Sequence, residues 1–186
     1  MECEADAIKS AMKADDRLYL CGIGKVNAAM VTQQAIDDGA DEIINAGLAG
    51  GIDTSLKVGN VVGIVAGIEY DFDLDELNHR GIGVLDERKV APIPFTGAKA
   101  EDKLILATGD HFRNDDGDFA LLRSLGCSVR DMEGAAIAHV CEKRAVKCRA
   151  IKAISNVAGQ GGMVEQYEVC KARALAALSE RLPNIL

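Results

Sequence analysis

Two acidic residues, Asp131 and Glu133, flank Met132 where a short strand pattern gives way to an almost wholly apolar helix pattern. One interpretation is structural, because a carboxylate here can cap the helix and favour the positive end of its dipole. The other is binding, because a carboxylate can accept hydrogen bonds from both hydroxyls of a sugar diol. We favour diol binding for Glu133 and a structural role for Asp131, and expect both at the binding site.

A second polar pair, Ser155 and Asn156, ends another strand pattern. The pair could simply begin a turn. Alternatively, the Asn156 amide offers one acceptor oxygen and two N–H donors, which suits the edge of a heterocycle. Ligands of open α/β sheets bind beyond the carboxyl ends of the strands. Both polar clusters lie at such ends, which favours the binding interpretation.

Two glycine-rich turns follow strand patterns, at Gly22-x-Gly24 and over residues 47–51. The first precedes a helix but lacks the third glycine of a dinucleotide-binding loop, and no clear helix follows the second. Neither has the lysine spacing of a Walker A loop. Each glycine pair suits a tight turn or the close approach of backbone to a ligand, and we expect no cofactor.

Composition restricts the partners. The chain has 186 residues, a net charge of −8, 4% aromatic residues and no Trp. Nucleic-acid binding needs a basic surface, and single strands also need stacking aromatics, so we expect no nucleic-acid partner. His79, His111 and His139 are far apart in the chain, which argues against a metal site. The chain lacks the G-x-S-x-G elbow of serine hydrolases, so we do not expect that class of enzyme.

The cysteines and the hydropathy indicate a compartment. Six cysteines form no C-x-x-C pair, and several lie inside apolar runs. This pattern is typical of free thiols in a reducing cytosol. No signal peptide opens the chain, and no stretch is long and apolar enough to span a bilayer. We therefore expect a cytoplasmic protein with no membrane partner.

Strand and helix patterns alternate along the chain. Apolar periodicity predicts helices over residues 2–13, 25–38, 118–125, 133–143 and 164–182. Apolar runs predict strands over residues 18–21, 42–46, 61–68, 104–108, 127–130 and 146–154. This alternation predicts an α/β fold with a mostly parallel sheet covered on both faces. No boundary signal divides it, so we expect one domain over residues 1–186.

Six segments in order resemble one family. They are residues 22–29, 44–51, 56–62, 108–112, 131–138 and 153–156. Together they are similar to the bacterial methylthioadenosine/S-adenosylhomocysteine nucleosidases of the purine nucleoside phosphorylase/hydrolase superfamily. The resemblance implies a three-layer α/β/α sandwich with a mixed, mostly parallel sheet, and a homodimer whose partner helps to close the site. It also implies hydrolysis of a purine nucleoside, such as methylthioadenosine or S-adenosylhomocysteine, in methionine salvage.

The resemblance assigns roles to single residues. It implies that Glu133 holds the ribose hydroxyls beside Met132, that Phe112 packs on the purine, and that Glu4 activates the water. Asn156 stands where the family has the aspartate that protonates the purine N7. The other positions implied at the substrate are Leu48, Ala49, Gly50, Asp131 and Ser155. These roles suit an oxocarbenium-like transition state, which needs a carboxylate near the sugar and a base at the water.

Three features depart from the family. The Asn156 amide cannot act as a general acid, although it can hydrogen-bond N7 and the 6-oxo group of hypoxanthine or guanine. Leu48 replaces a small residue, usually serine. The chain begins where the family's first strand should already have ended. The resemblance thus implies an amino-terminally truncated chain: either the true start lies upstream of Met1, or the chain compensates through dimer contacts or rearrangement.

These departures leave alternatives beside the leading hypothesis of a purine nucleosidase. The first is a 6-oxopurine nucleosidase, similar to futalosine hydrolase, or a phosphorylase. We rank phosphorolysis lower, since no arginine cluster near the glycine turns would hold phosphate. The second is a degenerate homologue that binds a nucleoside without cleaving it.

Overall fold

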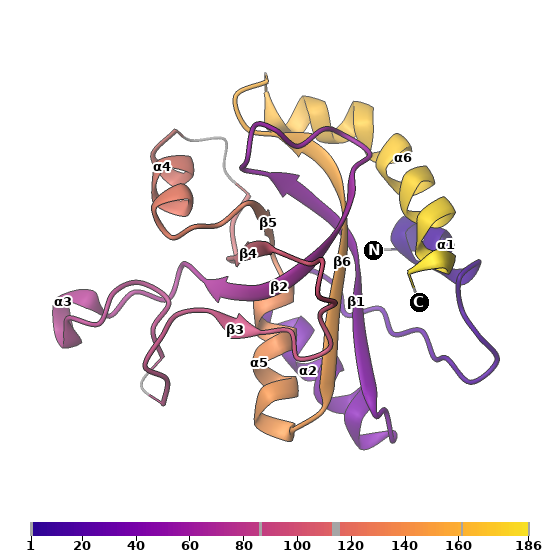
Figure 1. Ribbon diagram of the computed structural model, residues 1–186, viewed down its shortest axis with the longest axis horizontal. Helices are drawn as coiled ribbons and strands as arrows, with labels where there is room; N and C mark the ends of the chain where they lie inside the picture. Colours follow the sequence, from indigo (N-terminus) through magenta and orange to yellow (C-terminus); the bar gives the residue numbers. More distant parts are fainter. Residues whose placement is uncertain (1, 86, 113–115, 161, 186) are drawn as a thin grey trace.

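A mixed β-sheet forms the centre of the computed structural model, which describes residues 2–85, 87–112, 116–160 and 162–185 (Figure 1). Its strands are β1 (Glu42–Gly51), β2 (Val61–Glu69), β3 (Ile93–Pro94), β4 (Leu104–Thr108), β5 (Val129–Asp131) and β6 (Lys147–Val157). They follow the order β3-β2-β4-β5-β1-β6, and β2 also pairs with β6, so the sheet closes on itself. The β1–β6, β2–β4 and β4–β5 ladders are parallel, whereas β1–β5, β2–β3 and β2–β6 are antiparallel.

Helices cover both faces of the sheet. They are α1 (Glu2–Lys9), α2 (Lys25–Asp37), α3 (Asp75–Asn78), α4 (Asp116–Ser124), α5 (Gly134–Arg144) and α6 (Met163–Arg181), with a 3₁₀ turn at Leu182–Asn184. Alternate residues of β6 point to opposite faces, as a pleated strand requires. Ile151 and Ala153 pack under α6, whereas Ala150 and Ile154 join the core beneath α5. Helix α1 lies beside α6 at the same side of the molecule (Figure 1).

The ladder between β1 and β6 positions the site. It runs in parallel from Glu42↔Lys147 to Gly51↔Val157, with a register shift between Ala49 and Gly50. On its other side β1 pairs with β5 only through Gly50↔Arg130 and Gly51↔Val129. The polar residues that follow β5 and end β6 therefore come together around the carboxyl half of β1.

Two predicted features differ from the structure. The glycine-rich segment over residues 47–51, expected as a turn, continues β1. Its glycines suit a crowded strand, since a Cβ on Gly51 would lie 3.3 Å from Val157 Cγ2. The strand expected over residues 18–21 is wrong: the segment pairs with no strand of the described chain, and Leu20 is 50% exposed. A strand needs a hydrogen-bonded neighbour, and a cavity lies between this segment and β1.

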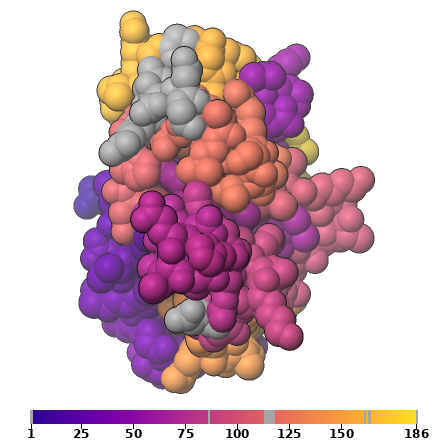
Figure 2. All heavy atoms as spheres, turned by 90° about the vertical axis from the view of Figure 1, so that its left-hand side faces the viewer, coloured from indigo at the N-terminus to yellow at the C-terminus, as the bar shows by residue number. Residues whose placement is uncertain are grey.

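The stretch after β2 is irregular, as its sequence predicts, and its described residues form only α3 and the short β3. Helix α3 and its flanking loops, in magenta, bulge from the centre of the face shown in Figure 2. Among the described residues, no helix is both long and apolar enough to cross a membrane.

Candidate active site

One cavity of about 870 Å³ gathers the residues that the sequence singled out. It lies along β1, between α1 and the segment over residues 15–23, and reaches the ends of β5 and β6. Every predicted site residue lines it: Glu4, Leu48, Ala49, Gly50, Phe112, Asp131, Met132, Glu133, Ser155 and Asn156. Segments from both ends of the chain thus converge on one space.

Asp131 holds the start of α5. Its Oδ1 accepts hydrogen bonds from Thr108 Oγ1 at 2.6 Å and from the backbone N–H of Gly134 at 3.1 Å. Its Oδ2 accepts from Gly134 N at 2.9 Å and lies 2.9 Å from Lys152 Nζ. These contacts satisfy the helix N-terminus and occupy the carboxylate, in agreement with a structural role.

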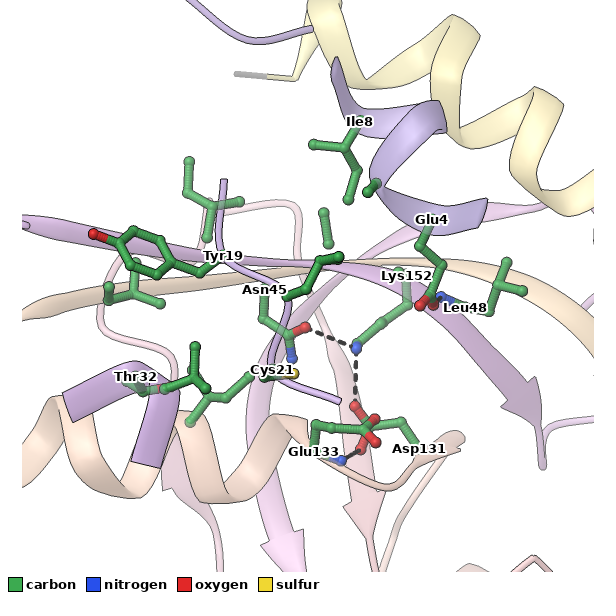
Figure 3. Close-up of a pocket in the computed structure, with 18 of the residues that line it drawn as sticks. Glu4, Ile8, Tyr19, Cys21, Thr32, Asn45, Leu48, Asp131, Glu133 and Lys152 are labelled. Carbon is green, nitrogen blue, oxygen red and sulfur yellow. Dashed lines mark hydrogen bonds and ion pairs between the residues drawn. The ribbon is translucent and has the colours of Figure 1, made fainter. Parts of the chain in front are cut away.

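Lys152 is one residue at this site that the sequence did not single out. It lies in β6, its side chain is only 3% exposed, and its Nζ contacts Asp131 Oδ2 and, at 3.0 Å, Asn45 Oδ1 (Figure 3). Burial lowers the pKa of Lys152, but the charges of Asp131, Glu133 and Glu4 raise it above its ordinary value. The sequence does contain a sign of this residue's role: a lysine inside the apolar run Ala-Ile-Lys-Ala-Ile is expected to be buried and to require a charge partner.

Glu133 precedes α5 and faces the cavity. Its Oε1 accepts a hydrogen bond from Gly24 N at 3.0 Å, and its Oε2 accepts from Met132 N at 3.3 Å. Gly24 has a φ of 94°, which favours glycine, so the Gly22-x-Gly24 turn serves to bring an N–H to this carboxylate. Burial and the charge of Asp131 raise the pKa of Glu133, while Lys152 opposes the shift.

Glu4 reaches the cavity from the opposite side, on α1. Its Oε1 accepts a hydrogen bond from Leu48 N at 2.8 Å, and Figure 3 shows it pointing toward Lys152. A Cβ on Gly47 would lie only 2.7 Å from this oxygen and 4.0 Å from Lys152 Nζ. The absence of a side chain at Gly47 therefore admits the Glu4 carboxylate beside the strand.

Ser155 and Asn156 form the other polar end of the cavity and are 2% and 1% exposed. Ser155 Oγ lies 2.8 Å from Asn156 Oδ1 and 3.3 Å from the Ala49 carbonyl oxygen, so its single proton favours the shorter contact. A Cβ on Gly50 would lie 3.2 Å from Asn156 Nδ2. Glycine at position 50 thus leaves room for the amide.

Phe112 lies at the rim, 48% exposed, and stacks edge-on to Tyr167 with ring centroids 6.2 Å apart. Its ring also faces a buried guanidinium, because Arg130 Cζ lies 5.7 Å from the Phe112 centroid. A flat aromatic side chain in the cavity that Asn156 also lines is suited to stacking on a purine.

Comparisons with known proteins identify relatives of this chain. A family profile described as "Phosphorylase superfamily" matches residues 17–182. The 5′-methylthioadenosine/S-adenosylhomocysteine nucleosidase of Anoxybacillus flavithermus is 34% identical over 173 residues, which cover 85% of this chain and 75% of that protein. The enzyme of the same name from Geobacillus kaustophilus is 35% identical over 180 residues, 87% of this chain and 76% of the relative.

Solved structures agree on the fold. The futalosine hydrolase of Helicobacter pylori superimposes with a TM-score of 0.83 at 21% identity, covering 100% of this chain and 95% of that one. The 5′-methylthioadenosine/S-adenosylhomocysteine nucleosidase from the same organism, in complex with a pyrrolopyrimidine compound, gives a TM-score of 0.83 at 20% identity with the same coverage. The predicted resemblance is confirmed: this chain belongs to the phosphorylase superfamily and is related to its bacterial 5′-methylthioadenosine/S-adenosylhomocysteine nucleosidases.

Proposed function

We propose that this protein hydrolyses the N-glycosidic bond of purine nucleosides. The observation that carries the proposal is the position of Glu4 and Glu133, which enter one cavity from different elements, with the buried Lys152 ammonium beside both. Two carboxylates on either side of a sugar provide a base for water and a stabilising charge for an oxocarbenium-like ion. The family relationship supports the same reaction, since its relatives are named as nucleosidases.

Each residue has one part in the reaction. Glu133 accepts hydrogen bonds from the ribose hydroxyls through lone pairs that Gly24 and Met132 leave available. The C1′–N9 bond breaks, and its electron pair leaves with the purine between Phe112 and Asn156. Glu4 takes a proton from water as the water oxygen bonds to C1′. Solvent protonates the departing purine anion, and Glu4 returns its proton to solvent, so the products are free purine and free sugar.

The relatives' names suggest 5′-methylthioadenosine and S-adenosylhomocysteine as substrates, and thereby a part in methionine salvage. The amide of Asn156, which cannot protonate a base, favours a 6-oxopurine nucleoside as a second candidate. The experiment is to incubate the protein with methylthioadenosine, S-adenosylhomocysteine, inosine and futalosine and to measure released purine by chromatography. If purine release requires phosphate, the reaction is phosphorolysis and not hydrolysis. Tight calorimetric binding without release would instead indicate a nucleoside-binding homologue.

We also propose a homodimer formed through an apolar stripe at the start of α2. The stripe consists of Ile23, Val26 and Met30, whose side chains are 56%, 79% and 64% exposed. Large apolar residues clustered on a surface mark interaction sites. Ile23 also lines the cavity, so a partner on the stripe would help to close the site.

Three further proposals complete the description. Residues 1–186 form one domain, and the helices on the two faces of the sheet make it a three-layer sandwich, which the packing of α5 and α6 supports. The protein is cytoplasmic, which the free state of all six cysteines supports. Its ligand is a small molecule, in keeping with the size of the cavity.

A further inference from the structure

Arg130 is a buried cation at the end of the cavity that Asn156 lines, which would hold the purine. The proposed reaction gives Arg130 no role. It is the middle residue of β5, pairs with Gly50 of β1, and is 6% exposed. A Cβ on Gly50 would lie 3.4 Å from Arg130 Cγ and 3.2 Å from Asn156 Nδ2. The arginine stem and the Asn156 amide therefore approach the same point of β1 and line the same cavity.

The guanidinium is fixed by its surroundings. Its Cζ lies 5.1 Å from the Phe119 ring centroid and 5.7 Å from that of Phe112. Its Nη1 lies 3.5 Å from Asp118 Oδ2, which is also 3.1 Å from His111 Nε2. Burial lowers the pKa of Arg130, while Tyr70 and Asp118 raise it. Arginine stays protonated in proteins, so this end of the cavity holds a guanidinium cation, paired with Asp118, in addition to the Lys152 ammonium near the acids.

We propose that Arg130 and Asn156 together select 6-oxopurine nucleosides, with Arg130 stabilising the purine as it leaves. The inference rests on the proposed nucleosidase function and specifies which class of purine that same site prefers.

Hydrogen-bonding capacity is the first argument. Adenine presents an acceptor at N7 and donors at its 6-amino group, whereas hypoxanthine and guanine present acceptors at both N7 and O6. An asparagine alone can pair with either kind of base, because it has a donor and an acceptor. Ser155 Oγ lies 2.8 Å from Asn156 Oδ1 and uses one of that oxygen's two acceptor sites, which favours Nδ2 as the group that meets the ligand. Arg130 carries donors only and so matches O6 and not an amino group.

The chemistry of the leaving group is the second argument. When the C1′–N9 bond breaks, its electron pair passes to the purine, and Asn156 has no proton to give. A 6-oxopurine can place this negative charge on O6, where a buried guanidinium stabilises it. Solvent then protonates the released purine anion. Adenine leaves best after protonation at N7, which a nearby positive charge opposes.

Calorimetry with free hypoxanthine and free adenine tests base selection without requiring turnover. We expect the wild-type protein to bind hypoxanthine about 10- to 100-fold more tightly than adenine. Arg130→Met should abolish this preference, and Arg130→Lys, which keeps the charge, should retain part of it. Arg149→Met is the matched control, because Arg149 is also buried but contacts the Ile185 carbonyl instead. The Arg149→Met variant should keep the wild-type preference for hypoxanthine.

Hydrolysis of 5′-methylthioinosine and 5′-methylthioadenosine, which differ only at the 6-position, gives a second readout. The ratio of their kcat/KM values should favour the 6-oxo substrate and fall toward one in Arg130→Met. Equal or tighter binding of adenine by the wild type, or an unchanged preference in Arg130→Met, would overturn base selection and leave the nucleosidase proposal standing. Binding of neither base, together with no release of purine from either substrate, would overturn both proposals.

Discussion

The ammonium of Lys152 lies 2.9 Å from Asp131 Oδ2, and both side chains are almost completely buried. The pair joins the middle of β6 to the start of α5, since Asp131 also accepts hydrogen bonds from Gly134 N. A buried ion pair costs desolvation energy, and its two charges must be removed together to avoid an unpaired charge. Lys152 therefore connects the stability of the core with the ionisation of the acids at the site.

Removal of the Lys152 charge should destabilise the protein. We expect Lys152→Met to lower the free energy of unfolding by about 3–5 kcal/mol, because Asp131 then stays buried without a cation. The measurement is urea unfolding. Lys152→Met combined with Asp131→Asn should recover part of the loss, since neither charge remains. A double variant as unstable as the sum of the two single variants would show that the pair is not coupled.

The Glu4 carboxylate is the expected base for water. Glu4→Gln should lower kcat by about 10²- to 10⁴-fold, because an amide cannot take the proton from water. Glu2→Gln is the matched control, since Glu2 is an exposed acid in the same turn of α1. Circular dichroism should find both variants folded. Equal rates for the two variants would remove Glu4 from the mechanism.

Gly47 gives Glu4 its place beside β1. In Gly47→Ala the new Cβ would lie 2.7 Å from Glu4 Oε1, so the carboxylate must move. A shift of about 1 Å in a catalytic group can cost about 10²-fold in rate. Steady-state kinetics should show this loss in kcat. The control is Gly162→Ala, where the nearest atoms lie 3.9 Å from the added Cβ, and its kcat should stay close to that of the wild type.

The raised pKa of Glu133 predicts opposite pH trends for activity and stability. In the proposed mechanism ribose binding needs the carboxylate, so kcat/KM should fall as pH decreases through a pKa above that of an ordinary glutamate. Folding favours the protonated form, so this contribution to stability is present at low pH and is lost as pH rises through the folded-state pKa.

Glu133→Gln separates the two trends. On the alkaline side of that pKa it should unfold with a higher free energy than the wild type, while losing substrate binding. The measurements are a pH profile of kcat/KM and urea unfolding on either side of the pKa. A variant that is less stable than the wild type at alkaline pH would contradict the stated cause of the shift.

The apolar stripe on α2 predicts a dimer that one charge can disrupt. Met30→Lys should shift the protein toward monomer in sedimentation velocity, because a lysine would be buried at the interface without a partner. Leu77→Lys on α3 is the control, since Leu77 is 78% exposed and lies away from the stripe. If Met30→Lys sediments as the wild type does, the interface lies elsewhere.

Local pattern was sufficient for most elements. The predicted helix over residues 25–38 matches α2 (Lys25–Asp37), and the predicted strand over 61–68 matches β2 (Val61–Glu69). Both follow from apolar periodicity within a few residues of chain. The segment over residues 18–21 shows the limit of this reasoning. Its apolar residues fit a strand, but a strand forms only where another backbone pairs with it.

For the site, residue order and local pattern were enough to place Asp131, Glu133 and Asn156 at the ends of strands. The groups that surround them depend on how the chain folds. Lys152 and Arg130 lie in strands whose patterns say nothing of a cavity, and Glu4 comes from the other end of the chain. Strand pairing and helix packing bring these groups together across long separations in sequence. Local periodicity cannot predict such contacts, because it depends only on residues that are close together in the chain.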